Sequence, residues 1–200
     1  MDALKKSTDE LPSRENKVVY ILPANPDDAA TMKWMKGVSG IAWNKDFILI
    51  QIAPPFFDEN SLKNTVAHEY HHSVFFENND NSSSLTLLEE VMLEGRADTF
   101  ARLMYPSTET PWSDFSSQHL EETTWKAFRE NLNSTDASIK DDFFYGNSSR
   151  GIPDRSSYKI GNKIMDRFIQ KNPDVSIAEW TEMSADEILN KSKFEELNNG

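Results

Sequence analysis

His68-Glu69-Tyr70-His71-His72 is the stretch from which the fold and chemistry of this chain are best predicted. It has the pattern H-E-x-x-H within a sequence of helical character. Two imidazoles four positions apart on a helix lie one turn above the other, with about 5–6 Å between their Cβ atoms. Both can therefore reach one zinc ion at about 2.0–2.1 Å. Glu69, between them, is placed to take a proton from a metal-bound water.

The surrounding residues predict a partly buried helix. Asn60 or Ser61 can cap its start by accepting backbone N–H groups that lack a helical partner. A polar run over residues 78–84 ends it. A surface helix whose histidines bind nothing is the alternative, but partial burial favours a metal site. The apolar residues that recur at helical spacing are Leu62, Val66, Ala67, Tyr70 and Val74.

A second helical pattern, over residues 85–105, offers the third ligand that a catalytic zinc site needs besides its open position. It carries Glu90, Glu94 and Asp98 at intervals of four, so these carboxylates share one face. Carboxylates beside an apolar face are unusual unless a cation lies opposite. We predict Glu94 as the third ligand and Asp98 as the acceptor of a ligand histidine's second N–H. An exposed acidic face is the alternative for Glu90 and Asp98.

Three residues near the motifs are interpreted separately. His71 points to another helix face, so we expect a core or surface imidazole. Arg96 is expected to pair with an acid of its own helix. Gly95 costs about 1 kcal/mol relative to alanine in a helix interior, and close approach of the two metal-binding helices would explain it.

These motifs resemble those of the gluzincin metallopeptidases, the thermolysin-like clan. More narrowly, A-H-E-Y-H-H at 67–72 and E-G-R-A-D at 94–98 are similar to a bacterial family of predicted zinc-dependent proteases. That family also has a Y-G…G-I-P…G-Y-x-I-G segment, which this chain matches over 145–161 except at Ser157, and Asn162 stands where an aromatic is common. The resemblance covers roughly residues 38–170.

The resemblance implies a gluzincin-like fold, a Zn²⁺ cofactor and a peptide or protein substrate. The implied reaction is peptide-bond hydrolysis by a zinc-bound water that Glu69 activates. Tyr158 is the implied donor to the oxyanion that forms on water attack. Tyr145 competes for that role, and a buried structural tyrosine is the alternative for Tyr158.

Two other functions stay open. A non-catalytic zinc-binding regulatory or interaction protein would keep the fold and the ligands, but it would not require Glu69. A metal-free helical interaction protein would carry the H-E-x-x-H pattern by chance, and the correctly spaced acidic helix argues against it.

The pattern of elements predicts an α+β fold: a small N-terminal β-sheet with the active-site helix, then a mainly helical C-terminal lobe. Residues 1–16 are polar and expected to be flexible. Residues 17–200 are expected to form one domain, with the sheet and active-site helix in 17–77 and the lobe in 78–200. The hairpin over 38–52 is a candidate edge for an extended substrate, with ordinary core strands as the alternative. We expect strands at 17–22, 38–43 and 47–52, a short helix at 27–36, and helices near 117–133, 157–171 and 176–196.

Composition narrows the partners and the compartment. The net charge of −12 argues against nucleic acid as a partner. The lack of cysteine excludes disulfides and a cysteine-based zinc site. No stretch approaches the ~20 apolar residues of a membrane span, and the N-terminus lacks the apolar core of a signal peptide. We expect a cytoplasmic protein, with an extracellular or cell-surface location as the alternative if a leader has been removed.

Overall fold

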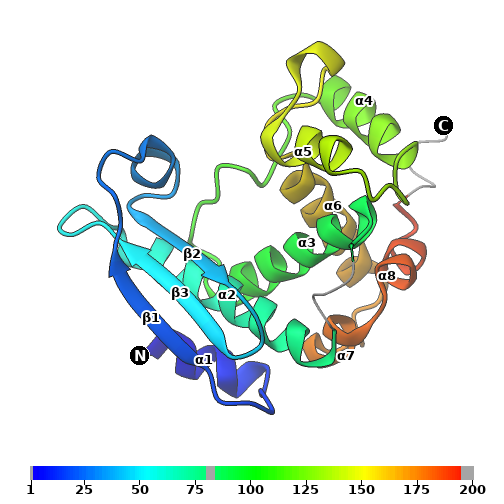
Figure 1. The fold of residues 1–200 in the computed structure, drawn as a ribbon. Helices are drawn as coiled ribbons and strands as arrows, with labels where there is room; N and C mark the ends of the chain where they lie inside the picture. The colour runs from blue at the N-terminus through cyan, green and yellow to red at the C-terminus, as the bar shows by residue number, and fades with distance from the viewer. Residues whose placement is uncertain (1, 80–83, 195–200) are drawn as a thin grey trace. The chain divides into compact units, whose positions relative to one another are not determined.

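The computed structural model describes residues 2–79 and 84–194, and its elements are labelled in Figure 1. Contacts group the chain into two compact units, residues 1–82 with 100–109 and residues 83–99 with 110–200. Helix α3 (Leu87–Met104) contributes residues to both. The fold class is α+β as predicted, with a mixed sheet near the N-terminus and a mainly helical remainder.

The first unit is built on a three-stranded sheet in the order β1-β3-β2. Strand β1 (Val18–Pro23) runs parallel to β3 (Phe47–Ile52), and β2 (Val38–Ala42) runs antiparallel to β3. The β2–β3 turn is held by the Asn44 side chain, which accepts hydrogen bonds from the backbone N–H groups of Asp46 at 2.8 Å and Phe47 at 3.0 Å. All three strands confirm the predicted ones to within a residue.

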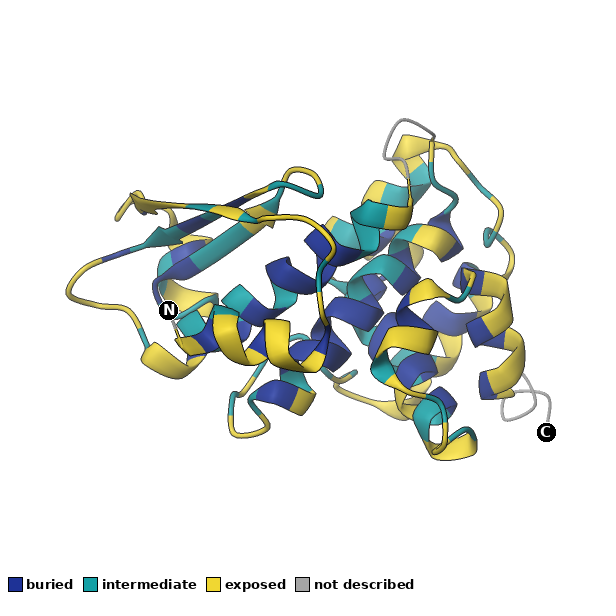
Figure 2. Ribbon diagram, turned by 90° about the horizontal axis from the view of Figure 1, so that it is seen from below, coloured by how far each residue is buried: buried dark blue, intermediate teal, exposed yellow. Residues whose placement is uncertain are grey.

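One face of the sheet carries the core of this unit. Ile48 and Ile50 of β3 are each 1% exposed, and α2 (Glu59–Asn78) packs against β2 and β3. The alternate residues on the opposite face, such as Tyr20 and Trp43, remain largely exposed. The alternation is clearest over Phe47–Ile50 of β3, whereas β1 is exposed at every residue but Val19; Figure 2 colours the strands by this burial. The short helix predicted at 27–36 is a π-helical segment over Ala30–Trp34.

Helix α2, which carries the H-E-x-x-H motif, begins earlier than predicted. Its N-cap is Asp58, whose carboxylate accepts hydrogen bonds from the Ser61 backbone N–H at 2.7 Å and the Ser61 hydroxyl at 2.9 Å. The predicted caps, Asn60 and Ser61, therefore lie inside the first turn. A carboxylate at the cap also faces the positive end of the helix dipole, which favours Asp58 over the neutral candidates.

Residues 2–10, within the segment expected to be flexible, form helix α1 (Asp2–Glu10), which packs on α2. Ala3, Ser7 and Leu11 are buried, and the hydroxyl of Tyr70 donates a hydrogen bond of 2.7 Å to the Leu11 carbonyl. Such a short polar helix is marginal by itself and is stabilised by tertiary packing, which polar composition alone does not predict.

The second unit is helical apart from its loops and one isolated bridge, within the part of the chain that the structure describes. The helix predicted over 176–196 is two helices, because Met183 and Ser184 adopt extended backbone between them. Helix α5 was not predicted. None of the described helices is long and apolar enough to cross a membrane. Besides its part of α3, the unit contains α4 (Gln118–Arg129), α5 (Ala137–Tyr145), α6 (Ser156–Lys171), α7 (Ile177–Glu182) and α8 (Ala185–Ser192).

Aromatic side chains form the core of the second unit. Trp125 lies edge-on to Phe194, with ring centroids 4.6 Å apart, and Phe128 packs against Phe143 at 5.8 Å. Each of these four side chains is at most 6% exposed. Trp125 and Phe128 of α4 are therefore core residues.

Candidate metal centre

The two histidines of the motif face each other on successive turns of α2. Their Nε2 atoms lie 2.9 Å apart, and the ring planes meet at 82°. Two nitrogens bound to one tetrahedral zinc lie about 3.3 Å apart, so the observed pair is close to that separation. His72 is 6% exposed, and its ring stacks on that of Phe76 one turn later. Burial and stacking restrict the rotamer of this imidazole.

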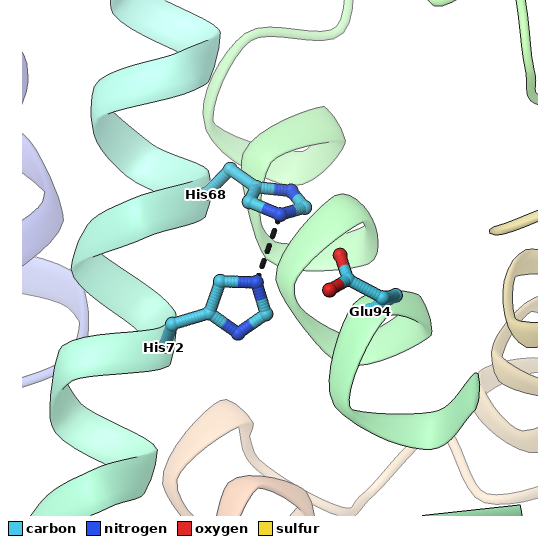
Figure 3. A group of neighbouring side chains, drawn as sticks. All are labelled: His68, His72 and Glu94. Atoms are coloured by element: carbon cyan, nitrogen blue, oxygen red, sulfur yellow. Dashed lines mark hydrogen bonds between the residues drawn. The ribbon is translucent and has the colours of Figure 1, made fainter. Parts of the chain in front are cut away.

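Glu94 of α3 completes a group of three candidate ligands. Figure 3 shows its carboxylate pointing toward the two imidazoles. One ligand atom from each of His68, His72 and Glu94 lies within 4.8 Å of the others. Two imidazole nitrogens and one carboxylate oxygen are a donor set that catalytic zinc sites use, with the fourth position left for water or substrate. The three residues that the sequence singled out therefore fit a zinc ion.

Glu69, the predicted base, is held by the sheet. Its side chain is buried, and Oε2 accepts a hydrogen bond of 2.7 Å from the backbone N–H of Ala42 in β2. Because the donor is a main-chain group of a paired strand, the position of this carboxylate is fixed by the backbone. Sequence patterns carry no signal for such a donor, since any residue except proline supplies an N–H.

Asp98 and Glu90 have different surroundings on α3. Asp98 is 3% exposed, and its Oδ2 accepts hydrogen bonds from the Trp112 indole N–H at 3.0 Å and the Asn162 amide at 3.2 Å. An exposed acidic face is therefore wrong for Asp98, and its bond to a ligand histidine stays a prediction. Glu90 forms an ion pair with Lys140 at 2.5 Å. The cation opposite this carboxylate is therefore a lysine and not a metal ion.

The partners of Asp98 were not predicted. Asn162 stood out in the sequence only as a departure from the family's usual aromatic. Asn162 lies one turn after Tyr158 on α6, where its side chain is buried. A buried amide needs a hydrogen-bond partner. The presence of asparagine at position 162 was therefore the one sequence signal for a polar contact there.

Gly95, next to Glu94, lies where α3 crosses α6 closely. The predicted crossing was between the two metal-binding helices, α2 and α3. A Cβ on Gly95 would lie 2.6 Å from the carbonyl carbon of Gly161, and a Cβ on Gly161 would lie 2.5 Å from the Val91 carbonyl oxygen. The two glycines thus let α3 and α6 approach backbone to backbone. The expectation that Gly95 serves the approach of the two metal-binding helices is corrected to this α3–α6 crossing.

His71 and Arg96 are buried close in sequence to the candidate ligands. The His71 ring is fully buried, 5.6 Å from that of Phe100, so the core interpretation is confirmed. The Arg96 guanidinium donates a hydrogen bond of 2.8 Å to the Met183 carbonyl. Burial lowers the pKa of Arg96 to about 10, which leaves it cationic at neutral pH.

The two candidate oxyanion donors differ in exposure. Tyr158, in the first turn of α6, is half-buried and packs edge-on against Trp112 and Phe144, with ring centroids 6.0 and 6.1 Å away. The Arg155 guanidinium lies 5.7 Å from its ring centroid. Tyr145, at the end of α5, is 77% exposed. Packing therefore restrains the Tyr158 side chain far more than that of Tyr145.

The protein has an α+β fold and brings two imidazoles and one carboxylate together. These features define it as a candidate metal-binding protein. The chain belongs, more narrowly, to the family described as "Predicted Zn-dependent protease (DUF2268)", whose model it matches over residues 1–190. This match confirms the resemblance to predicted zinc-dependent proteases and extends it beyond residues 38–170. No curated protein and no solved structure matches the chain.

Proposed function

We propose that this protein is a zinc-dependent metallopeptidase that hydrolyses peptide bonds. The observation that carries the proposal is the group formed by His68, His72 and Glu94, with Glu69 in the same motif as the two histidines. Membership of a family of predicted zinc-dependent proteases supports it. The family description points to a peptide or protein as the substrate.

In the proposed mechanism His68, His72 and Glu94 hold Zn²⁺, which when bound would polarise the substrate carbonyl and lower the pKa of a coordinated water toward about 7. The Glu69 carboxylate accepts a proton from the attacking water and passes it to the leaving nitrogen. The Tyr158 hydroxyl donates to the carbonyl oxygen as negative charge develops there. Asp98 acts through the imidazole of a ligand histidine by accepting its second N–H.

A non-catalytic zinc-binding regulator is the second candidate. It would use the same three ligands, so zinc binding alone does not separate the two functions. Glu69 does separate them, because metal binding does not require a carboxylate at that position. Its burial and its bond to a paired strand favour the enzyme, since a precisely held carboxylate suits proton transfer.

Zinc content of the purified protein tests the site. We expect one zinc per chain in the wild type and a zinc affinity reduced by at least about tenfold in Glu94→Ala. Glu90→Ala, which removes a carboxylate paired with Lys140 on the same helix, is the matched control and should bind zinc normally. Failure to bind zinc after reconstitution, or equal zinc loss in both variants, would contradict the assignment.

Glu69→Gln tests catalysis with the metal in place. We expect full zinc content and a fall in peptide hydrolysis on the order of 10³-fold, because the amide keeps the shape of the side chain but cannot accept the proton. Hydrolysis would be followed with a quenched fluorescent peptide library in the zinc-loaded protein. Activity equal to that of the wild type would sink the catalytic role, and zinc-loaded wild type that cleaves nothing would favour the regulator.

A further inference from the structure

Glycine at position 40 leaves a slot on β2 in which the Glu69 side chain lies. A Cβ built on Gly40 would fall 2.6 Å from Cγ and 3.0 Å from Oε1 of Glu69, and 2.8 Å from Cγ2 of Thr65. Contacts below 3.0 Å between such atoms are essentially never observed, so even one methyl group would force a shift. Two of the three atoms belong to Glu69 itself, hence any residue but glycine displaces this side chain.

The requirement at Gly40 is one of space and not of backbone conformation. Gly40 is absent from the residues with positive φ, which among the described glycines are Gly37, Gly146 and Gly151. Alanine could therefore adopt the backbone geometry of Gly40 without the strain of the left-handed region. A substitution here consequently reports on the space around Glu69 and Thr65 and not on backbone strain.

The register of the hairpin explains why Ala42 can hold the carboxylate. The Trp43 N–H bonds to the Phe47 carbonyl, and the Gly37 carbonyl accepts from Ala53, so the odd-numbered residues of β2 exchange hydrogen bonds with β3. The N–H groups of Gly40 and Ala42 then point away from β3, toward the edge of the strand. At that edge Ala42 donates its N–H to Glu69 Oε2 at 2.7 Å.

We propose that Gly40 is a positioning residue for the catalytic base, acting through Glu69, an inference that rests on the proposed function. The missing side chain lets α2 approach β2 closely enough for the Ala42 N–H to fix Oε2 of Glu69. Oε1 is then the oxygen that exchanges the proton with the attacking water. Ala42 thereby contributes a backbone N–H donor, and Gly40 contributes the space that the Glu69 side chain occupies.

Gly40→Ala, studied in the zinc-loaded full chain, tests this role by kinetics. We expect unchanged zinc content, a kcat lowered on the order of 10²-fold and a KM within about threefold, since a displacement of about 1 Å has effects of this size. The readout is cleavage of a quenched fluorescent peptide that the wild type hydrolyses. In the Glu69→Gln background the same substitution should have little further effect, because both changes act on one group. Equal losses in both backgrounds, or an unchanged kcat in the wild-type background, would overturn the proposal.

Amide hydrogen exchange by NMR gives a readout that does not depend on activity. We expect the Ala42 N–H to be protected in the wild type and its protection to fall at least about tenfold in Gly40→Ala, while the Trp43 N–H, bonded within the sheet, keeps its protection as a check on folding. Ser39→Ala, on the opposite face of the strand, should leave Ala42 protected. Undiminished Ala42 protection in Gly40→Ala would overturn the inference.

The two measurements separate this inference from the proposed function. If the zinc-loaded wild type shows no Glu69-dependent cleavage, the proposed function fails and Gly40 loses its catalytic meaning. Loss of Ala42 protection would then still establish that Gly40 positions Glu69, whatever the role of that carboxylate. If the wild type cleaves peptides but Gly40→Ala behaves like it in both measurements, the proposed function stands and this inference falls.

Discussion

Lys17 and Glu77 form an ion pair in which each side chain is only 4% exposed. The Lys17 ammonium also donates to the carbonyls of Lys45 at 2.6 Å and Ser73 at 3.2 Å. Glu77 accepts two further bonds, from the Ser13 hydroxyl and the Arg14 backbone N–H. Buried charges persist only when they are paired and hydrogen-bonded, and this pair ties the start of β1 to the end of α2.

The pair should make stability depend on pH. Burial raises the pKa of Glu77, but the hydrogen bonds from Lys17, Ser13 and Arg14 outweigh it, so the pKa lies below the ordinary value of 4.5. A carboxyl with a depressed folded-state pKa stabilises the protein above its unfolded pKa, and this contribution is lost as the pH falls through the folded pKa. We expect the melting temperature of the wild type to fall as the pH drops below about 4.5.

Glu77→Gln should weaken that pH dependence, because glutamine does not titrate. Its melting temperature should be lower than that of the wild type at pH 7, and the two curves should converge toward pH 3. Circular dichroism melts between pH 3 and 7 measure both. Parallel curves over the whole range would show that other carboxyl groups cause the acid dependence.

The N-cap of a helix contributes to the stability of that helix. Asp58→Ala removes the acceptor of the first free N–H groups of α2 and should lower the free energy of unfolding by about 1 kcal/mol. Asn60→Ala, which alters the cap expected from the sequence, should change it by less than about 0.5 kcal/mol. Urea denaturation of both variants checks the assignment. A larger loss for Asn60→Ala than for Asp58→Ala would contradict it.

Strands and long helices could be predicted from the sequence because their signals are local. The run Phe47–Ile52 is nearly all apolar, and the H-E-x-x-H helix has apolar residues at helical spacing. Helix α1 could not be predicted from the sequence, because it is stabilised by packing on α2. The Asp58 cap was missed because two neighbouring polar residues, Asn60 and Ser61, are also suitable caps. Propensity is a weak guide where tertiary contacts decide.

In the candidate site too, the features with a local sequence signal were predicted and those set by tertiary contacts were not. His68, Glu69, His72 and Glu94 were predicted because side-chain chemistry at a fixed spacing identifies them. The slot at Gly40, the N–H of Ala42 and the α3–α6 crossing at Gly95 depend on which backbones come together. These features are set by tertiary structure and leave no pattern in the local sequence.

Zinc should stabilise the whole molecule if the proposed site is correct. A ligand that binds only the folded state raises stability by about 2.7 kcal/mol when its free concentration is 100 times its Kd. We therefore expect the melting temperature to rise on zinc loading in the wild type and to rise much less in Glu94→Ala. Differential scanning calorimetry with and without zinc measures this, and equal shifts in both proteins would point to binding elsewhere.

The division of α3 has a consequence for how the chain can be cut. The path of the chain passes from one unit to the other three times, after residues 82, 99 and 109. A fragment that ends at residue 82 would lack Phe100, against which the rings of Tyr70 and His71 pack, and would leave apolar surface open to aggregation. No single break in the gene separates the two units, because residues 83–99 of the second lie between the two segments of the first, so neither unit is encoded as one uninterrupted stretch.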